Sequence, residues 1–343
     1  MKNPRYILPF FFIFGSLVLL AGCGGNGSGE AASPEGESRP IRIAVIPKGT
    51  THAFWQSIHA GAIKAEREVN EAGGNLRITW QGPLLENDRT QQIDLVETFT
   101  TRRVDGIVLA PLDSRALVAP VNAAHRAGIP VAIIDSGIET ENIISFIASD
   151  NFRGGQLAAR RLGELLGGEG NILMLRYQVG SASTEEREAG FMETLIEEFP
   201  DIVVVSDNQY AGPNRETALT AATNLLNRHG RDLDGVFTSN ESATAGMLLA
   251  LRRYTEAGRP IRFVGFDAAD ELLTGLRDDE LHGLIVQNPF NMGYLGVMSM
   301  VRHLRGETLE PNIDTGVTLI TRENVDSEEM QTLLFPPLRE YLD

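Results

Sequence analysis

The sequence lacks a second cysteine for a disulfide and has fewer basic than acidic residues. Cysteine occurs once among 343 residues, at Cys23. No disulfide can therefore form within the chain, and stability has to come from core packing. Acidic residues outnumber basic ones by 46 to 30, and no basic cluster stands out. Nucleic acid is not expected as a partner, because binding it requires Lys and Arg to neutralise phosphates.

Long hydrophobic runs are also missing, apart from one near the start. Residues 7–20 are almost entirely apolar and follow Lys2 and Arg5. This run is too short to span a bilayer comfortably, and its basic start is typical of a signal peptide. It ends in Leu-Ala-Gly-Cys at 20–23, which resembles the bacterial lipobox, where the cysteine after the cleavage site carries a lipid. An ordinary signal peptide followed by a chance cysteine is the alternative.

These features predict a signal peptide at 1–22 and a flexible tether at 23–40 that is rich in Gly, Ser, Glu and Pro. Lipidation of Cys23 would anchor the protein to a membrane on the periplasmic side of the cell envelope. The remainder of the chain is long enough for two domains of ordinary size.

From residue 41 onward, short β-branched apolar runs alternate with longer amphipathic stretches. Strands are expected at 41–46, 76–81, 105–110, 131–134 and 143–148, and then at 171–175, 202–207, 235–239, 261–265 and 284–287. Helices are expected between most of them, such as 54–70, 88–102, 154–166 and 241–254. Strands that are apolar throughout and separated by helices favour parallel sheets covered on both faces. Two such series predict an α/β fold with two doubly wound, parallel-sheet lobes.

The polar residues that follow the predicted strands are the candidate site, because ligands of open α/β sheets bind beyond the carboxyl ends of the strands. After the first strand come His52 and two adjacent aromatics, Phe54 and Trp55. An aromatic ring can cover the apolar face of a sugar. One ring in the core and the other on the surface is an equally good interpretation. The other candidates are Asp113, Arg187, Asn240, Asp267 and Gln287.

Each of these polar residues alone is more often a helix cap or a turn residue than a ligand contact. Arg187 is unusual because the helix dipole opposes a cation in a first turn, although a surface salt bridge would explain it. Together the set suits a polyol. Carboxylates accept hydrogen bonds from hydroxyls, Arg donates them, and Asn and Gln do both.

The ordered set of motifs resembles the periplasmic monosaccharide-binding proteins of the ribose and galactose type. The motifs are Phe54-Trp55, 105–107 with 111–114, 127–130, 149–151, Arg187 before Phe191, 237–240, 264–267, and Gln287 before Pro289. The resemblance covers roughly 41–321 and implies a type I binding-protein fold with a hinge of three crossovers. It implies one lobe of 41–147 plus 289–314 and a second lobe of 148–288 plus 315–343.

The resemblance further implies that Phe54 and Trp55 stack on a sugar ring while the polar candidates hold its hydroxyls. His52 stands where the ribose binder has an Asn, so the sugar stays open among ribose-, galactose- and xylose-like monosaccharides. The implied function is to deliver this sugar to the permease of an ABC-type importer. A monomer without cofactor or metal is expected.

Some of the same residues also fit other functions. Asp113, Asp267 and Arg187 could serve as catalytic acids with an anion clamp, but the sequence has no nucleophile elbow, phosphate loop or His/Cys metal spacing. A sugar-responsive gene regulator would need a helix-turn-helix where this chain has its signal peptide and tether. A sensory role, in which the protein signals to a membrane receptor, stays open beside import.

Overall fold

Two six-stranded sheets organise the chain, and each carries helices on both faces. The computed structural model describes residues 39–254 and 260–342. The strands of the first sheet are β1 (Ile41–Ile46), β2 (Leu76–Trp80), β3 (Gly106–Leu109), β4 (Val131–Ile134), β5 (Ser145–Ala148) and β11 (Asn312–Asp314). Those of the second are β6 (Glu169–Arg176), β7 (Asp201–Tyr210), β8 (Gly235–Thr238), β9 (Arg262–Phe266), β10 (Gly283–Gln287) and β12 (Val317–Ile320).

The two sheets have the same strand order. The first runs β11-β5-β4-β3-β1-β2 and the second β12-β10-β9-β8-β6-β7, so β1 corresponds to β6 and β4 to β9. Neighbouring strands are parallel, with one exception: β12 pairs antiparallel to β10, whereas β11 pairs parallel to β5. The prediction of two doubly wound α/β lobes is confirmed.

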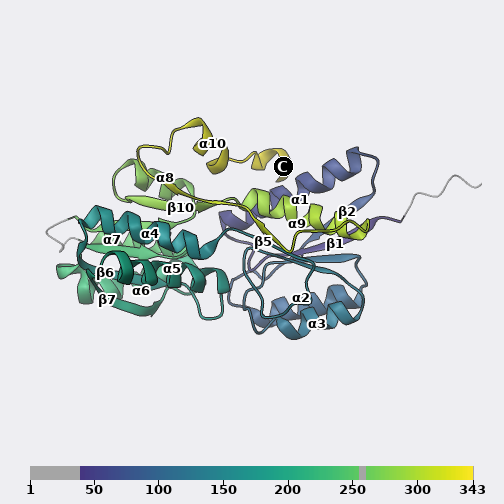
Figure 1. Cartoon of the computed structure of the whole chain (residues 1–343), viewed down its shortest axis with the longest axis horizontal. Coiled ribbons are helices and arrows are strands. Elements are labelled where there is room, and N and C mark those ends of the chain that lie inside the picture. Colours follow the sequence, from purple (N-terminus) through teal and green to yellow (C-terminus); the bar gives the residue numbers. More distant parts are fainter. Residues whose placement is uncertain (1–38, 255–259, 343) are drawn as a thin grey trace, which may run out of the picture. The chain divides into compact units, whose positions relative to one another are not determined.

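Helices cover both faces of the first sheet (Figure 1), and an apolar cluster lies under each pair of helices. Helices α1 (Ala53–Glu71) and α9 (Pro289–Leu304) cover one face, where Ile43, Ile58 and Val297 belong to one cluster. Helices α2 (Arg89–Thr101) and α3 (Val118–Arg126) cover the other face, over a separate cluster that includes Phe99 and Val121. The strands are buried on both sides, which is why they are apolar throughout.

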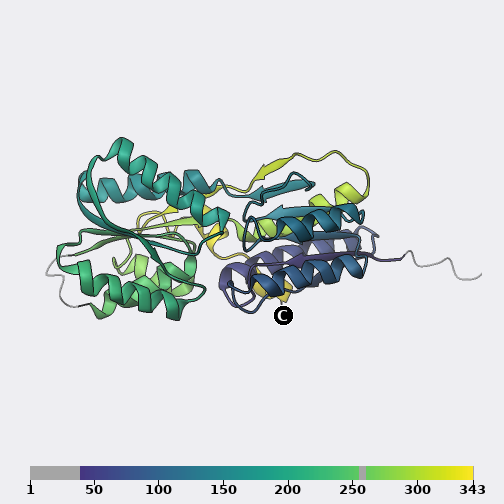
Figure 2. The ribbon, with the colours of Figure 1, turned by 90° about the horizontal axis from the view of Figure 1, so that it is seen from below.

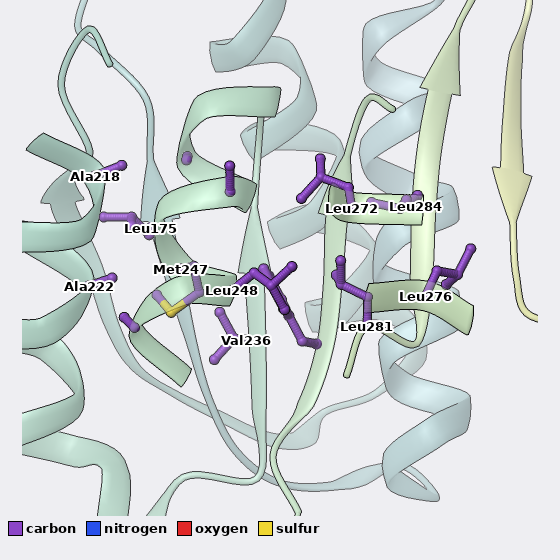
Figure 3. Packing of buried hydrophobic residues seen from close by; sticks show 14 of the residues in the cluster. Leu175, Ala218, Ala222, Val236, Met247, Leu248, Leu272, Leu276, Leu281 and Leu284 are labelled. Carbon is purple, nitrogen blue, oxygen red and sulfur yellow. The ribbon is translucent and has the colours of Figure 1, made fainter. Parts of the chain in front are cut away.

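The second lobe is layered in the same way (Figure 2). Helices α4 (Asn151–Leu166) and α5 (Ala182–Glu198) pack on one face of its sheet. Helices α6 (Arg215–His229), α7 (Glu241–Arg253), α8 (Asp270–Arg277) and α10 (Glu328–Leu334) pack on the other, where a short 3-10 helix, Gly230–Asp232, follows α6. Figure 3 shows this second face, in which Val236 and Leu284 of the strands meet Leu248 and Leu272 of the helices.

The end of the chain does not stay with the second lobe. The predicted boundary placed all of 315–343 there, and α10 does pack in its core through Met330. After Pro336 and Pro337, however, α11 (Leu338–Leu342) lies on α1 of the first lobe. Arg67 of α1 donates a 2.6 Å hydrogen bond to the Glu340 carbonyl. The two prolines prevent α10 from continuing, and α11 is too short to carry a helical pattern in sequence.

Predicted strands and helices are present, with ends shifted by a few residues. Strands β11 and β12 were not predicted. Strand β11 spans three residues and is largely exposed, so it has no apolar run that could reveal it. The predicted signal peptide and Cys23 lie outside the described residues. Within 39–254 and 260–342, no helix is long and apolar enough to cross a membrane.

Candidate functional site

A polar cavity lies where the carboxyl ends of strands from both sheets meet. The first lobe lines it with Lys48, His52, Phe54, Trp55, Glu86 and Asp135. The second lobe lines it with Tyr177, Ser183, Thr184, Arg187, Asn240, Glu241, Asp267 and Gln287. The space between these side chains is small, about 30 Å³. We call this space the central cavity.

The structure brings seven of the eight predicted site residues to the central cavity: His52, Phe54, Trp55, Arg187, Asn240, Asp267 and Gln287. Asp113 is the exception. Its carboxylate accepts hydrogen bonds from the backbone of Arg115 and Ala116, and pairs with Arg89 at 2.7 Å. Asp113 therefore caps the turn before α3, and its side chain is absent from the cavity lining.

Asp135 holds the comparable position one strand further along the sheet. It follows β4 directly, whereas three residues separate Asp113 from the end of β3, and the Asp135 backbone has a left-handed φ of 65°. Lys48, which follows β1, forms a 2.8 Å ion pair with Asp135. Lys48 also donates hydrogen bonds to Ser181 and Ser183 of the second lobe, at 3.3 and 3.1 Å. Both charges are almost fully buried, so each compensates the other.

Glu86 is the second buried acid of the first lobe, in the loop after β2. It is 2.6 Å from His52 Nδ1 and accepts a 2.6 Å hydrogen bond from Trp55 Nε1. Burial by itself lowers the pKa of His52, but the hydrogen bond and charge of Glu86 raise it above the ordinary value of 6.5. Burial likewise opposes ionisation of Glu86, yet His52 brings the pKa of this carboxyl below its ordinary value.

Arg187 is the main cation that the second lobe presents, and it is 2 % exposed. Its Nε donates to the Asn151 side chain at 2.9 Å and one terminal nitrogen donates to the Ser239 carbonyl at 3.0 Å. The guanidinium lies 4.2 Å from the centre of the Phe266 ring. The other terminal nitrogen is buried without a hydrogen-bond partner in the described part of the chain. Helix α5 begins at Ala182, so Arg187 lies beyond its first turn and the expected opposition of the helix dipole does not apply. Fixed contacts hold one side of the guanidinium.

Asp267 lies opposite, at the end of β9. Gln287 donates a 2.7 Å hydrogen bond to its carboxylate, and the Glu241 backbone donates another at 3.2 Å. Burial raises the pKa of Asp267 to about 6, although Arg187 and Gln287 act in the opposite direction. Among the described residues, the side-chain oxygen of Gln287 and one carboxylate oxygen of Glu241 are also buried without a hydrogen-bond partner. Asn240 caps α7 by accepting from the Ala243 backbone.

Several cavity residues were missed in the sequence: Lys48, Glu86, Asp135, Tyr177, Ser183, Thr184 and Glu241. The rule that polar residues after strands form the site does apply to Lys48 and Asp135, and it would have found both. Glu86 and Tyr177 had weaker signals. Glu86 lies in a loop well after its strand, and a tyrosine next to a strand is most often core.

A larger cavity of about 670 Å³ adjoins the central one and shares Phe54, Asp267 and Gln287 with it. The segment 333–340 forms much of its wall, with Leu and Pro side chains. Its lining is mainly apolar, so the smaller central cavity holds the chemistry. No group of metal ligands occurs within the described ranges 39–254 and 260–342. Buried donors and acceptors without partners, beside aromatic rings, suit a neutral ligand with several hydroxyls.

Comparisons with known proteins agree with this chemistry. A family model described as a periplasmic binding protein domain matches residues 43–308. The ribose import binding protein of Bacillus subtilis is 28 % identical over 309 residues, which cover 90 % of this chain and 96 % of that protein.

Two solved structures are similar over most of this chain and over all of their own length. A solute-binding protein from Agrobacterium vitis with bound D-fucose is 34 % identical, with a TM-score of 0.81 over 86 % of this chain and 100 % of that one. A carbohydrate-transporter solute-binding protein from Agrobacterium radiobacter, in complex with D-arabinose, is 30 % identical, with a TM-score of 0.81 over 87 % and 100 %. These relatives are binding proteins of sugar transporters, not enzymes.

Proposed function

The chain belongs to the periplasmic binding protein family, and we propose on this premise that it captures a monosaccharide between its two lobes. The observation that carries the proposal is the set of buried polar atoms without partners at the central cavity. Arg187 offers a donor, while Glu241 and Gln287 offer acceptors. A hydroxyl group can satisfy both kinds, because it donates one hydrogen bond and accepts others.

The aromatic residues support a sugar over other polyhydroxy molecules. Phe54 and Trp55 both line the cavity, with ring centres 5.0 Å apart and planes at 89°. Rings at a right angle offer one face and one edge, and a face can cover the C–H side of a pyranose or furanose. The sugars named for the three relatives described above, ribose, D-fucose and D-arabinose, favour a pentose or a deoxyhexose.

Binding requires the lobes to move. A cavity of about 30 Å³ holds about one water molecule, so a sugar enters only when the lobes separate. Hinge closure around a ligand is a population shift, in which contacts from both lobes favour the closed form. The crossovers after Ala148, Gln287 and Asp314 supply a hinge for this motion.

We further propose that Cys23 carries a lipid and that the protein works outside the cytoplasm. The apolar run at 7–20 and the Leu-Ala-Gly-Cys motif at its end support this, together with the extracytoplasmic location of the family. The closed, sugar-loaded form would then be recognised by the permease of an ABC importer. The proposed active form is a monomer, because one chain supplies both lobes and the residues that line the central cavity.

A thermal-shift screen tests the sugar. The chain from Arg39 onward is mixed with a panel of pentoses, hexoses and polyols, and the unfolding midpoint is followed. A sugar at one hundred times its dissociation constant stabilises the folded state by about 2.7 kcal/mol, which shifts the midpoint by several degrees. Silence across all pentoses and hexoses would contradict the proposed function.

The anchor and the partner need separate tests. Cys23→Ala should release the protein from washed membranes while its sugar affinity stays the same, and retention of this variant would refute lipidation. Delivery is tested by sugar uptake into vesicles that contain a permease and an ATPase encoded by neighbouring genes, with and without the protein. If addition of sugar instead leads to phosphorylation of a histidine kinase encoded nearby, a sensory role is indicated.

A further inference from the structure

One buried carboxylate at the central cavity, that of Glu86, is held by several hydrogen-bond donors of the protein itself. Glu86 is 5 % exposed and contacts three side-chain donors. Two come from the first lobe, His52 and Trp55, each at 2.6 Å. The third is the hydroxyl of Tyr177, which donates to the other oxygen of Glu86.

The three donors come from both sides of the cavity. His52 and Trp55 lie at the start of α1, where they line the cavity beside Phe54. Tyr177 follows β6 in the second lobe and is 1 % exposed. The next residue, Gln178, donates a 2.7 Å hydrogen bond to the Glu86 carbonyl. Glu86 is therefore the point at which the sugar-facing start of α1 is joined to the second lobe.

The hydrogen bonds that Glu86 accepts within its own lobe and from the second lobe have different roles. A buried charge must keep its hydrogen bonds, since losing them costs several kcal/mol. The bonds to His52 and Trp55 lie within one lobe and survive when the lobes separate. The bond to Tyr177 joins two lobes and exists only while they are closed. Charge-assisted hydrogen bonds are about twice as strong as neutral ones, so this one favours the closed form.

We propose that Glu86 is a positioning residue that orients His52 and Trp55 toward the sugar. We further propose that the hydrogen bond from Tyr177 to Glu86 stabilises the closed form. The carboxylate fixes the rotamers of His52 and Trp55, so that both face the ligand before it arrives. When the lobes close, Tyr177 completes the hydrogen bonding of Glu86, which slows reopening and sugar release. This inference rests on the proposed sugar-binding function and names the residues that control its affinity.

Tyr177→Phe removes the hydrogen bond to the Glu86 carboxylate and leaves the other interlobe hydrogen bonds in place. Hydrogen bonds to charged groups contribute about 1.5–3 kcal/mol, so the dissociation constant for the sugar identified in the panel should rise about 10- to 100-fold. Most of this change should appear in the release rate, measured by stopped-flow. Tyr294→Phe is the matched control, because Tyr294 donates a 2.7 Å hydrogen bond to Glu68 away from the cavity. Its affinity should stay within about twofold of the parent.

Glu86→Gln tests the positioning role. The amide keeps the size of the side chain but loses the charge, so sugar affinity should fall further than in Tyr177→Phe. In the Glu86→Gln background, Tyr177→Phe should add almost nothing, because the two changes remove one interaction. A purely structural role predicts another pattern: a lower unfolding midpoint of the free protein with an unchanged release rate.

The outcomes separate this inference from the function on which it rests. If the parent protein binds no sugar at all, the proposed function has failed. If it binds a sugar, and Tyr177→Phe releases that sugar as slowly as the parent does, the closure role of Tyr177 is refuted. Additive effects of the two changes would refute the shared carboxylate.

Discussion

Asp135 and Asp267 occupy equivalent positions in the two lobes but have opposite surroundings. Asp135 follows β4 and Asp267 follows β9, the fourth strands of two sheets with the same order. Both backbones have a left-handed φ of 65°. Both backbone amides donate to the neighbouring strand, to the carbonyls of Ile147 and Ile285. The fold thus places one carboxylate at the same point of each lobe.

The side-chain partners differ. Asp135 forms an ion pair with Lys48, whereas Asp267 has only the Gln287 side chain and a backbone amide as hydrogen-bond donors within the described residues. The other buried acid of the first lobe, Glu86, likewise has a partner in His52, whereas Arg187 and Gln287 of the second lobe each keep a side-chain atom without a hydrogen-bond partner in the described part of the chain. The ion pair of Asp135 with Lys48 helps to hold the structure of the first lobe. Among residues 39–254 and 260–342, Asp267 has no such ion pair and is therefore available to bind a ligand.

The largest expected effect comes from removing the second lobe's unpaired donor. Arg187→Ala should weaken sugar binding by about 30-fold to several thousand-fold, since truncating a buried charged contact costs about 2–5 kcal/mol. Calorimetric titration measures the loss. Arg160→Ala is the matched control, because its ion pair with Glu198 lies on the surface of the same lobe. Equal affinity of the Arg187 variant and the parent would remove this residue from the site.

Lys48→Met makes the first lobe resemble the second by leaving Asp135 without its cation. Breaking a buried pair in this way should lower the free energy of unfolding by about 3–5 kcal/mol. Urea denaturation measures the change. Adding Asp135→Asn should restore part of the stability, because the isolated charge is then gone. A loss below about 1 kcal/mol in the single variant would show that the pair is not buried in solution.

The pKa of Asp267 predicts a pH dependence with a definite sign. The folded-state pKa of about 6 lies above the ordinary 3.8, so the folded protein favours the protonated acid. This contribution is complete below pH 3.8 and is lost as the pH rises through about 6. The free energy of unfolding should fall by about 3 kcal/mol over this range relative to Asp267→Asn. Asn accepts the left-handed backbone, which makes it the suitable variant.

A parallel pH scan of the parent and Asp267→Asn checks this prediction in the absence of sugar. The difference between the two curves isolates this one acid from the others that titrate nearby. Identical slopes would contradict a raised pKa. His52 should act in the higher range: its raised pKa gives stability that is present below pH 6.5 and declines at more alkaline pH.

The helix pairs that cover the two sheets sharpen the comparison, because here the lobes should respond alike. A Cβ added to Gly61 would overlap with the Phe290 carbonyl of α9, and one added to Gly190 would overlap with the Phe152 carbonyl of α4. Alanine at either position should destabilise the fold by about 1–3 kcal/mol or more. Gly137→Ala is the control, since its Cβ would find ordinary contacts. If thermal unfolding shows that only one of the two alanine variants is destabilised, the lobes are not equivalent at these helix contacts.

The smallest effect is expected where the chain end joins the lobes. Arg67→Ala removes the hydrogen bonds of α1 to α11 and the contact with the Tyr341 ring at 5.0 Å. These contacts are exposed, so the global loss should stay below about 1 kcal/mol. Hydrogen exchange should nevertheless speed up in 338–342. Unchanged exchange there would show that Arg67 does not hold α11.

Much of the fold could be predicted from local patterns. The strands are buried on both faces, so their apolar runs stand out in the sequence, and the helices between them carry one apolar face. Strand β12 is a short run of Val, Thr, Leu and Ile, so its sequence did carry a strand pattern that was overlooked. Strand β11 escaped because its pairing with β5 defines it, rather than its own composition. The position of α11 on α1 escaped for a similar reason, since short segments take their place from the surface that receives them.

For the site, the sequence by itself determined where to look. Polar residues after strands gather at one edge because parallel strands end there, and this located His52, Arg187 and Asp267. Only the tertiary structure decided which of them face the cavity: Asp113 accepts hydrogen bonds from the turn before α3, whereas Asp135 lines the cavity. Only the tertiary structure showed that Tyr177 contacts Glu86, because burial and long-range hydrogen bonds depend on neighbours that are distant in the chain.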